Sequence, residues 1–239
     1  MAASGEQLLD FVPEGWELLD SGELDFNQDG ITDYVGVLEK SNPGLEEWWP
    51  RILFAVASNG EGRYELDFQD CNLIRTSDEG GINGDPYGPL SAEGVSFTTR
   101  ADGGSNWRWK EQFTYAYKGG EWYLVYSENI YGFVFGCTTE YSVNDWEKGI
   151  GTRNRRSDSF EEMEKDKPEY DLAYEIPLDD AFTIYQAGMR RELAPKRAAD
   201  WTVEEVEIAD GIELEEASVC LPDSVSWFAD CDEKGVLYT

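Results

Sequence analysis

The stretch GVSFTTRADGGSNWRWKEQFTYAYKGGEWYLVYSENIYGFVFG, residues 94–136, decides the fold. Apolar and polar residues alternate along most of it, and β-branched and aromatic side chains are frequent, which is typical of strands. Glycine-rich segments at residues 101–106 and 119–120 interrupt the alternation, and glycine allows the positive φ that tight turns need. The stretch therefore predicts three antiparallel strands joined by hairpin turns.

The same pattern extends toward the N-terminus. Residues 15–25 and 33–40 alternate on either side of an acidic loop, and residues 51–58 and 63–69 flank the turn sequence NGEG. Five to seven successive strands predict a mainly β fold, an antiparallel meander with propeller-blade-like hairpins and a few short helices; an α+β fold is the alternative. One short helix is expected at residues 4–13.

The pattern changes after residue 147. Residues 147–171 are polar, charged and poorly patterned, and they predict a surface loop or linker. Residues 177–193 predict an amphipathic helix, and residues 201–221 alternate again and predict further strands. We therefore expect a β-rich domain at 1–147, with residues 148–239 packed on it.

Charge and composition exclude several function classes. The formal charge is −31, of which residues 1–147 carry −19, residues 148–197 carry −1 and residues 198–239 carry −11. Nucleic acid and anionic membranes are excluded as partners, because phosphate binding needs clustered Lys and Arg. The absence of His excludes Ser–His–Asp and Cys–His catalysis, so an enzyme would depend on carboxylates, Tyr, Lys or a metal.

The segment LDFNQDGITDYVGVLE, residues 24–39, crowds oxygen-bearing side chains around one glycine. Ca²⁺ binds six to eight hard oxygens, and alternate positions of a tight loop converge on one point. The candidate ligands, four side chains and one backbone carbonyl, are Asp25, Asn27, Asp29, Ile31 and Asp33. The alternative is a turn in which the same groups cap backbone N–H groups without a metal.

This loop resembles the calcium loops of dockerins and of FG-GAP or VCBS repeats, and the strand after it fits the FG-GAP form. Over residues 7–140 the chain also resembles a family of uncharacterised exported bacterial proteins. The shared segments are PEGW at 13–16, the acidic loop, GDPY at 84–87 and GGSNWRW at 103–109. The resemblance implies export from a bacterial cell and a structural Ca²⁺ ion, and it implies no activity.

The expected location is extracellular or at the cell surface, with an export signal or lipid anchor trimmed; the cytoplasm is the alternative. No apolar run is long enough for a membrane span. An oxidising compartment would allow a local disulfide between Cys220 and Cys231, and the alternative is four reduced thiols.

Aromatic residues mark a second candidate site. Strand alternation places Trp107, Trp109 and Glu111 on one face, and Arg108 and Lys110 on the other. The two tryptophans and Arg108 are candidate ligand-binding residues, because an aromatic platform can stack sugar rings. The alternative is a sheet core in which the tryptophans pack and Arg108 is paired.

Three functions are compatible with these features. The first is a non-catalytic, exported binding or interaction protein whose ligand is a glycan or a protein, with a structural Ca²⁺ site. The second is a carbohydrate-active enzyme that uses carboxylates, with Glu111 as the first candidate. The third is an acidic cytosolic inhibitor or immunity-type protein that covers a basic partner with its acidic tail. The sequence does not indicate the oligomeric state.

Overall fold

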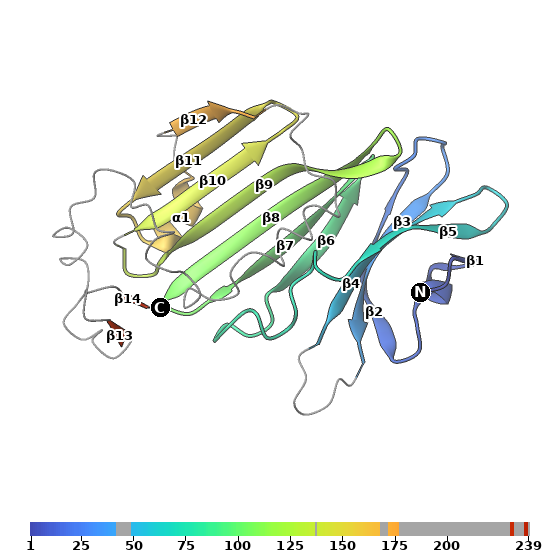
Figure 1. Ribbon diagram of the computed structural model, residues 1–239, viewed down its shortest axis with the longest axis horizontal. Coiled ribbons are helices and arrows are strands. Elements are labelled where there is room, and N and C mark those ends of the chain that lie inside the picture. Colours follow the sequence, from blue (N-terminus) through green and yellow to red (C-terminus); the bar gives the residue numbers. More distant parts are fainter. Residues whose placement is uncertain (42–48, 137, 168–171, 177–229, 232–236, 239) are drawn as a thin grey trace. The chain divides into compact units, whose positions relative to one another are not determined.

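A computed structural model describes residues 1–41, 49–136, 138–167, 172–176, 230–231 and 237–238 (Figure 1). The chain divides into two compact units, Met1–Met189 and Arg190–Thr239. Among its described residues, the second unit has one antiparallel pair, β13 (Asp230–Cys231) with β14 (Leu237–Tyr238). All other described elements belong to the first unit.

The first unit contains a five-stranded antiparallel sheet of order β1-β5-β4-β3-β2. Its strands are β1 (Ser4–Gly5), β2 (Trp16–Leu24), β3 (Asp33–Lys40), β4 (Arg51–Ser58) and β5 (Tyr64–Asp70). A 3-10 helix, η1 (Leu8–Phe11), connects β1 to β2. Four of these strands, β2 to β5, follow each other in chain order.

The second sheet has seven antiparallel strands in the order β12-β11-β10-β9-β8-β7-β6 (Figure 1). Its strands are β6 (Tyr87–Glu93), β7 (Ser96–Gly104), β8 (Trp107–Lys118), β9 (Glu121–Phe133), β10 (Thr139–Asp145), β11 (Ile150–Arg156) and β12 (Leu172–Glu175). Every strand pairs with its neighbour in sequence. The prediction of a mainly β, antiparallel meander is confirmed, and the meander is divided between two sheets.

The glycine turn between β8 and β9 shows how the sequence sets this topology. Gly119 and Gly120 have φ of 61° and 94°, values that side-chain-bearing residues rarely adopt. Two consecutive residues of positive φ make the turn whose twist matches that of paired strands. The predicted hairpins β4–β5, β7–β8 and β8–β9 are all present.

The main core lies between the two sheets and is centred on Trp122 of β9, which is 3% exposed. Its ring centroid lies 5.0 Å from those of Phe26 and Phe97 and 5.7 Å from that of Phe68. The indole N–H donates to Oδ2 of Asp67 at 2.7 Å, so the polar atom of the ring is satisfied. One side chain thus joins residues from both sheets.

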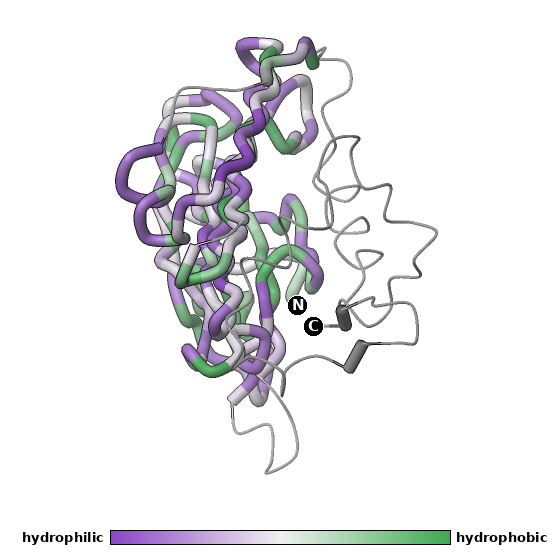
Figure 2. Tube along the Cα trace, turned by 90° about the vertical axis from the view of Figure 1, so that its left-hand side faces the viewer, coloured by the Kyte–Doolittle hydropathy of each residue, from purple (hydrophilic) through white to green (hydrophobic). Residues whose placement is uncertain are grey.

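The central strands of the five-stranded sheet, β3 and β4, are buried on both faces, which explains their nearly continuous apolar runs. In β3, Val35 and Val37 face the core between the sheets, while Leu38 faces a second core with Phe11 of η1 and Phe54. Hydrophobic and hydrophilic residues are interspersed along the trace of the first unit (Figure 2). A strand buried on both faces loses the period-two pattern that marks a half-exposed strand.

The edges of the two sheets meet at β2 and β6. The carboxylate of Asp20 in β2 accepts hydrogen bonds from the backbone N–H of Leu90, at 2.9 Å, and from the Tyr87 hydroxyl, at 3.1 Å. The backbone N–H of Asp25 donates to the carbonyl of Gly94 at 3.3 Å. Each edge therefore satisfies part of the other's hydrogen-bonding capacity.

The interpretation of residues 147–171 as a loop or linker is wrong for much of this segment. It contains β11, which pairs with β10 along its whole length, and the helix α1 (Phe160–Asp166). Ser159 caps α1, and Phe160 and Met163 pack on Ile130 of β9. In Figure 1 the helix α1 lies behind β9 and β10. Two apolar residues three apart therefore form the face by which this short helix packs on the sheet.

The other helix predictions have different outcomes. The helix expected at residues 4–13 is only the single turn of η1, because Ser4 and Gly5 pair with β5 instead. The amphipathic helix predicted at 177–193 and the strands predicted at 201–221 lie outside the described residues. The described part of 148–176 continues the sheet and packing of the first unit.

Candidate functional site

The acidic loop between β2 and β3 is organised by its own hydrogen bonds. Both carboxylate oxygens of Asp25 accept backbone N–H groups, from Asp29 at 3.1 Å and from Gly30 at 3.0 Å. The Asn27 side chain accepts from the N–H of Asp29, and Asp29 accepts from the N–H of Ile31 at 2.8 Å. These contacts are turn caps in which short polar side chains hold a tight backbone.

Asp33 lies beneath this loop and is fully buried. One of its oxygens accepts the N–H of Ser58 at 2.8 Å, and the other accepts the N–H of Phe26 at 3.1 Å. Burial raises the pKa of Asp33, and the two N–H groups only partly oppose this effect. Asp33 therefore ties the start of β3 to the end of β4.

The fit of this loop to Ca²⁺ is incomplete. Among the described residues, no group of three or more acidic, Cys or His side chains is arranged to hold a metal ion. Asn27 and Asp29 are exposed, Asp25 is half-buried, and all three retain lone pairs beyond their hydrogen bonds, whereas the oxygens of Asp33 face buried N–H groups. Calcium binding by this loop stays a prediction.

The structure places the predicted aromatic residues on the expected faces of β8. Trp109 and Glu111 both contact Arg75, on the side of the sheet that carries the main core. Arg108 and Lys110 point the opposite way and pair with Glu161 and Glu164 of α1, at 3.5 and 2.5 Å. Arg108 is therefore separated from the tryptophans by the thickness of the sheet.

Arg75 covers two of the candidate residues. Its guanidinium lies 4.2 Å from the ring centroid of Trp109 and donates to both oxygens of Glu111, at 2.8 and 2.7 Å. A planar guanidinium can stack on a ring and bind a carboxylate bidentately at the same time. Trp109 and Glu111 are thus engaged within the protein.

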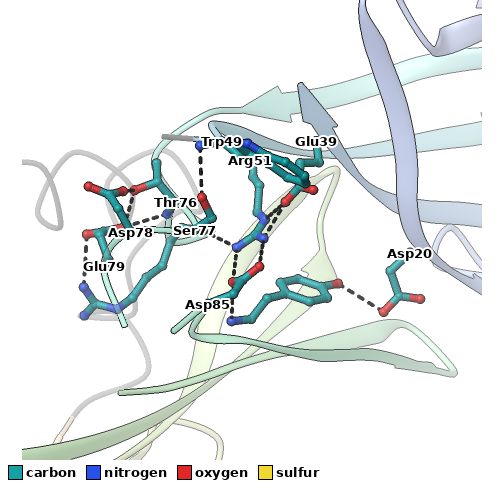
Figure 3. Close-up of polar contacts among 11 residues, drawn as sticks. Asp20, Glu39, Trp49, Arg51, Thr76, Ser77, Asp78, Glu79 and Asp85 are labelled. Atoms are coloured by element: carbon teal, nitrogen blue, oxygen red, sulfur yellow. Dashed lines mark hydrogen bonds and ion pairs between the residues drawn. The ribbon is translucent and has the colours of Figure 1, made fainter. Parts of the chain in front are cut away.

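A buried arginine, Arg51 of β4, anchors the loop that carries Arg75 (Figure 3). Arg51 is 1% exposed and lies between Glu39 and Asp85, where it donates to both carboxylates; its Nη1 also donates to the carbonyl of Arg75 at 3.0 Å. Its guanidinium lies 5.0 Å from the centroid of the Tyr87 ring. The network fixes both ends of the 75–85 loop against the sheets.

The charge state of Asp85 follows from this network. Burial would raise the pKa of Asp85, but the hydrogen bonds from Arg51 and from the N–H of Tyr87 outweigh it and hold the pKa below the ordinary value. Asp85 is therefore ionised in the folded protein at neutral pH. The ion pair with Arg51 persists under those conditions.

Trp107 lies in an aromatic group that leaves rings in contact with solvent. Its ring is stacked on Tyr131 of β9, with 5.4 Å between centroids and 15° between planes, and it also contacts Phe133. Phe135, in the loop after β9, packs edge-to-face on Phe133. Tyr131 is 48% exposed and Phe135 is 76% exposed. Exposed aromatic groups of this size mark binding surfaces more often than isolated apolar residues do.

Polar side chains lie next to the stacked rings, on the same face of the seven-stranded sheet. Asn129 of β9 is paired in register with Ser142 of β10, which is paired with Arg153 of β11. Directly paired residues point to the same side, and Asn129 lies two residues from Tyr131, so this row lies beside the stacked rings. We call this surface the open face; its members are Trp107, Asn129, Tyr131, Glu140, Ser142, Arg153 and Arg155.

Sequence reasoning identified Trp107 but missed Tyr131 and Arg75. The register of the Gly119–Gly120 turn would place Ile130 opposite Trp109. A β-bulge between β8 and β9 shifts the pairing, so that Tyr131 takes this position. The abundance of Tyr and Phe after residue 121 was the available signal, but the bulge has no clear mark in the sequence.

The described residues test only part of the cysteine predictions. Cys71 is a free, exposed thiol. Cys220 and Cys137 lie outside the described residues, and only the backbone of Cys231 is described, as part of β13. The Cys220–Cys231 disulfide therefore stays a prediction.

Comparison of the chain with protein-family models, with curated proteins and with solved structures gave no match. The described residues include no helix of the length and apolar character needed to cross a membrane.

Proposed function

We propose that this chain is a non-catalytic, exported binding protein that binds an oligosaccharide on its open face. One observation carries the proposal: the Trp107 and Tyr131 rings are stacked in parallel on a sheet face, and nearly half of Tyr131 stays exposed. Aromatic rings left in solvent cost free energy unless a ligand covers them.

The chemistry of the open face favours a sugar over a purely apolar ligand. The face of an aromatic ring is electrostatically negative and attracts the C–H groups of a sugar ring. The neighbouring Asn129 and Ser142 side chains offer an amide and a hydroxyl, which can donate to and accept from sugar hydroxyls. Ring stacking next to a row of polar groups suits a ligand with one apolar face and a polar edge.

The alternative of a carboxylate-dependent hydrolase has less support. A glycosidase needs one carboxyl group that donates a proton and a second that attacks or activates water. Both oxygens of Glu111 are bound by Arg75, and Arg75 also covers Trp109. Because Arg75 already binds both oxygens of Glu111, this side chain has less support as a catalytic group, and binding without turnover is the function we propose.

An oligosaccharide array, followed by calorimetry and product analysis on each hit, tests this function. We expect binding without cleavage, and a loss of at least tenfold in affinity for Tyr131→Ala. Tyr123→Ala is the matched control, because Tyr123 lies on the same strand near its opposite end, hydrogen-bonded to Glu121. Binding that is unchanged in Tyr131→Ala would refute the proposed surface, and cleaved products would refute a non-catalytic role.

The acidic loop supports a second part of the proposal, a structural Ca²⁺ ion held by Asp25, Asn27 and Asp29. The ion would offset charge in a chain of net charge −31 and would be available outside cells. We expect Ca²⁺ to raise the melting temperature and EGTA to reverse the change, and Asp29→Ala to remove the response. An unchanged response in Asp29→Ala would place the ion elsewhere.

A further inference from the structure

Strand β11 brings arginine side chains to the open face. Glu140 of β10 is paired with Tyr131 on one side and with Arg155 on the other. The three residues therefore form a row that crosses three strands on one face. Neighbouring strands lie about 4.8 Å apart, so the backbones at Tyr131 and Arg155 are separated by about 10 Å.

The two arginines of this strand that share the open face differ in their partners. Arg153 donates to Glu140 at 2.6 Å, and this hydrogen bond raises the pKa of Arg153. Arg155 is exposed and makes no hydrogen bond or ion pair with any side chain in the part of the chain that the structure describes. Among the described residues Arg155 is thus an unpaired cation, on a face that already carries an aromatic platform.

The surroundings make this cation unusual. The chain has 50 acidic residues against 19 basic ones, so most exposed cations have an acidic partner within reach. The nearest acidic group in the row, Glu140, is already occupied by Arg153. Distant negative charges act weakly at Arg155, because the Debye length in physiological salt is about 8 Å.

We propose that the oligosaccharide bound on the open face is acidic, and that its carboxylate or sulfate pairs with Arg155 while another ring of the same chain stacks on Tyr131. A guanidinium matches the planar geometry of a carboxylate and also binds sulfate oxygens through two N–H groups. The separation of the two residues requires at least two linked sugar units. This inference rests on the proposed saccharide binding and adds the charge of the ligand.

The test compares three hexasaccharides by calorimetry: an oligogalacturonate, a sulfated galactan fragment and a neutral galactan fragment. We expect at least one of the acidic ligands to bind at least tenfold more tightly than the neutral one. Arg155→Gln should remove this preference. Arg63→Gln is the matched control, since Arg63 is an arginine of the β4–β5 turn region that donates to Ser4; it should leave the preference unchanged.

The possible outcomes separate this inference from the proposed function. Preference for the carboxylate or for the sulfate identifies the anionic group. Equal binding of neutral and acidic ligands, or a preference that survives Arg155→Gln, overturns the acidic ligand while saccharide binding stands. If none of the three binds and the array also gives no hit, both proposals fail. If only a neutral glycan binds in a Tyr131-dependent way, the acidic ligand alone is overturned.

Discussion

At the acidic end of the first unit, Asp33 is completely buried and its charge is met by backbone N–H groups; at the aromatic end, Phe135 is 76% exposed while Arg51 is 1% exposed. The first arrangement uses a carboxylate to join strands. The second pairs a buried arginine with carboxylates and leaves aromatic rings exposed to water. The comparison shows that the acidic end serves the fold, whereas the aromatic end leaves exposed the rings on which the proposed binding surface depends.

The largest expected effect concerns the buried arginine that supports the aromatic end. Arg51→Met leaves the Glu39 carboxylate, whose side chain is 4% exposed, without its partner. We expect the free energy of unfolding to fall by about 3–5 kcal/mol, as for other broken buried ion pairs. Urea denaturation measures the change. Arg63→Met, an exposed arginine, should alter stability by no more than about 0.5 kcal/mol, and an equal loss in the two variants would contradict the role of Arg51.

A smaller loss is expected at the acidic end. Asp33→Asn replaces one of two acceptor oxygens by an N–H₂ group, so the N–H of Phe26 or of Ser58 loses its partner. An unsatisfied buried donor costs about 1–3 kcal/mol. Urea denaturation in EGTA measures this cost without a contribution from metal. Glu61→Gln, on the exposed β4–β5 turn, is the control, and equal stabilities would show that Asp33 does not tie β3 to β4.

A still smaller change in the free energy of unfolding is expected when the pH is lowered and the Arg51–Asp85 ion pair is lost. Because the folded-state pKa of Asp85 is lowered, its contribution to stability is present above the ordinary value of 3.8 and is lost as the pH falls through the lowered pKa. The side chain is 47% exposed, so solvent screening limits the effect to less than about 1 kcal/mol. Between pH 6 and pH 3, the free energy of unfolding should therefore fall less in Asp85→Asn than in the native chain. If it falls equally in both, Asp85 does not contribute to the pH dependence of stability.

The smallest effect on stability should come from the binding surface itself. Tyr131→Ala removes a half-exposed ring and its stacking on Trp107, which we expect to lower the free energy of unfolding by only about 0.5 kcal/mol. The same variant should lose oligosaccharide binding, so thermal melting and calorimetry on one preparation would separate the two roles. A stability loss of the size expected for Arg51→Met would make Tyr131 part of the core instead.

Strands β2 to β5 and β7 to β9 were predictable because their signals are local, namely alternating residues and glycine turns such as Gly119–Gly120, whereas β6 was not predicted. β11 was missed because its inward side chains are not apolar. Thr152 and Asn154 are 3% and 0% exposed, and Arg153 and Arg155 alternate with them, so the strand has no hydropathy period. Burial in this strand depends on the docking of α1, which no short window of sequence reveals.

The candidate site was partly predictable for a similar reason. The faces of Trp107, Trp109 and Arg108 followed from strand alternation alone, and they are as expected. The stacking of Tyr131 on Trp107 depends on a bulge in β9, and the covering of Trp109 depends on Arg75, a residue 34 positions earlier in the chain. Contacts of this kind are set by the tertiary structure, which sequence periodicity does not encode.

Apart from the β1–β5 pair, neighbouring strands in each sheet are consecutive in the chain, and this order has a consequence for folding. Hairpins between neighbouring segments close short loops, so each meander can form from contacts of low sequence separation. The docking of the two sheets joins residues far apart in the chain, such as Asp67 and Trp122, and we expect these contacts to form late, after the transition state of folding. In kinetic measurements, Trp122→Phe should then accelerate unfolding and leave the rate of refolding nearly unchanged.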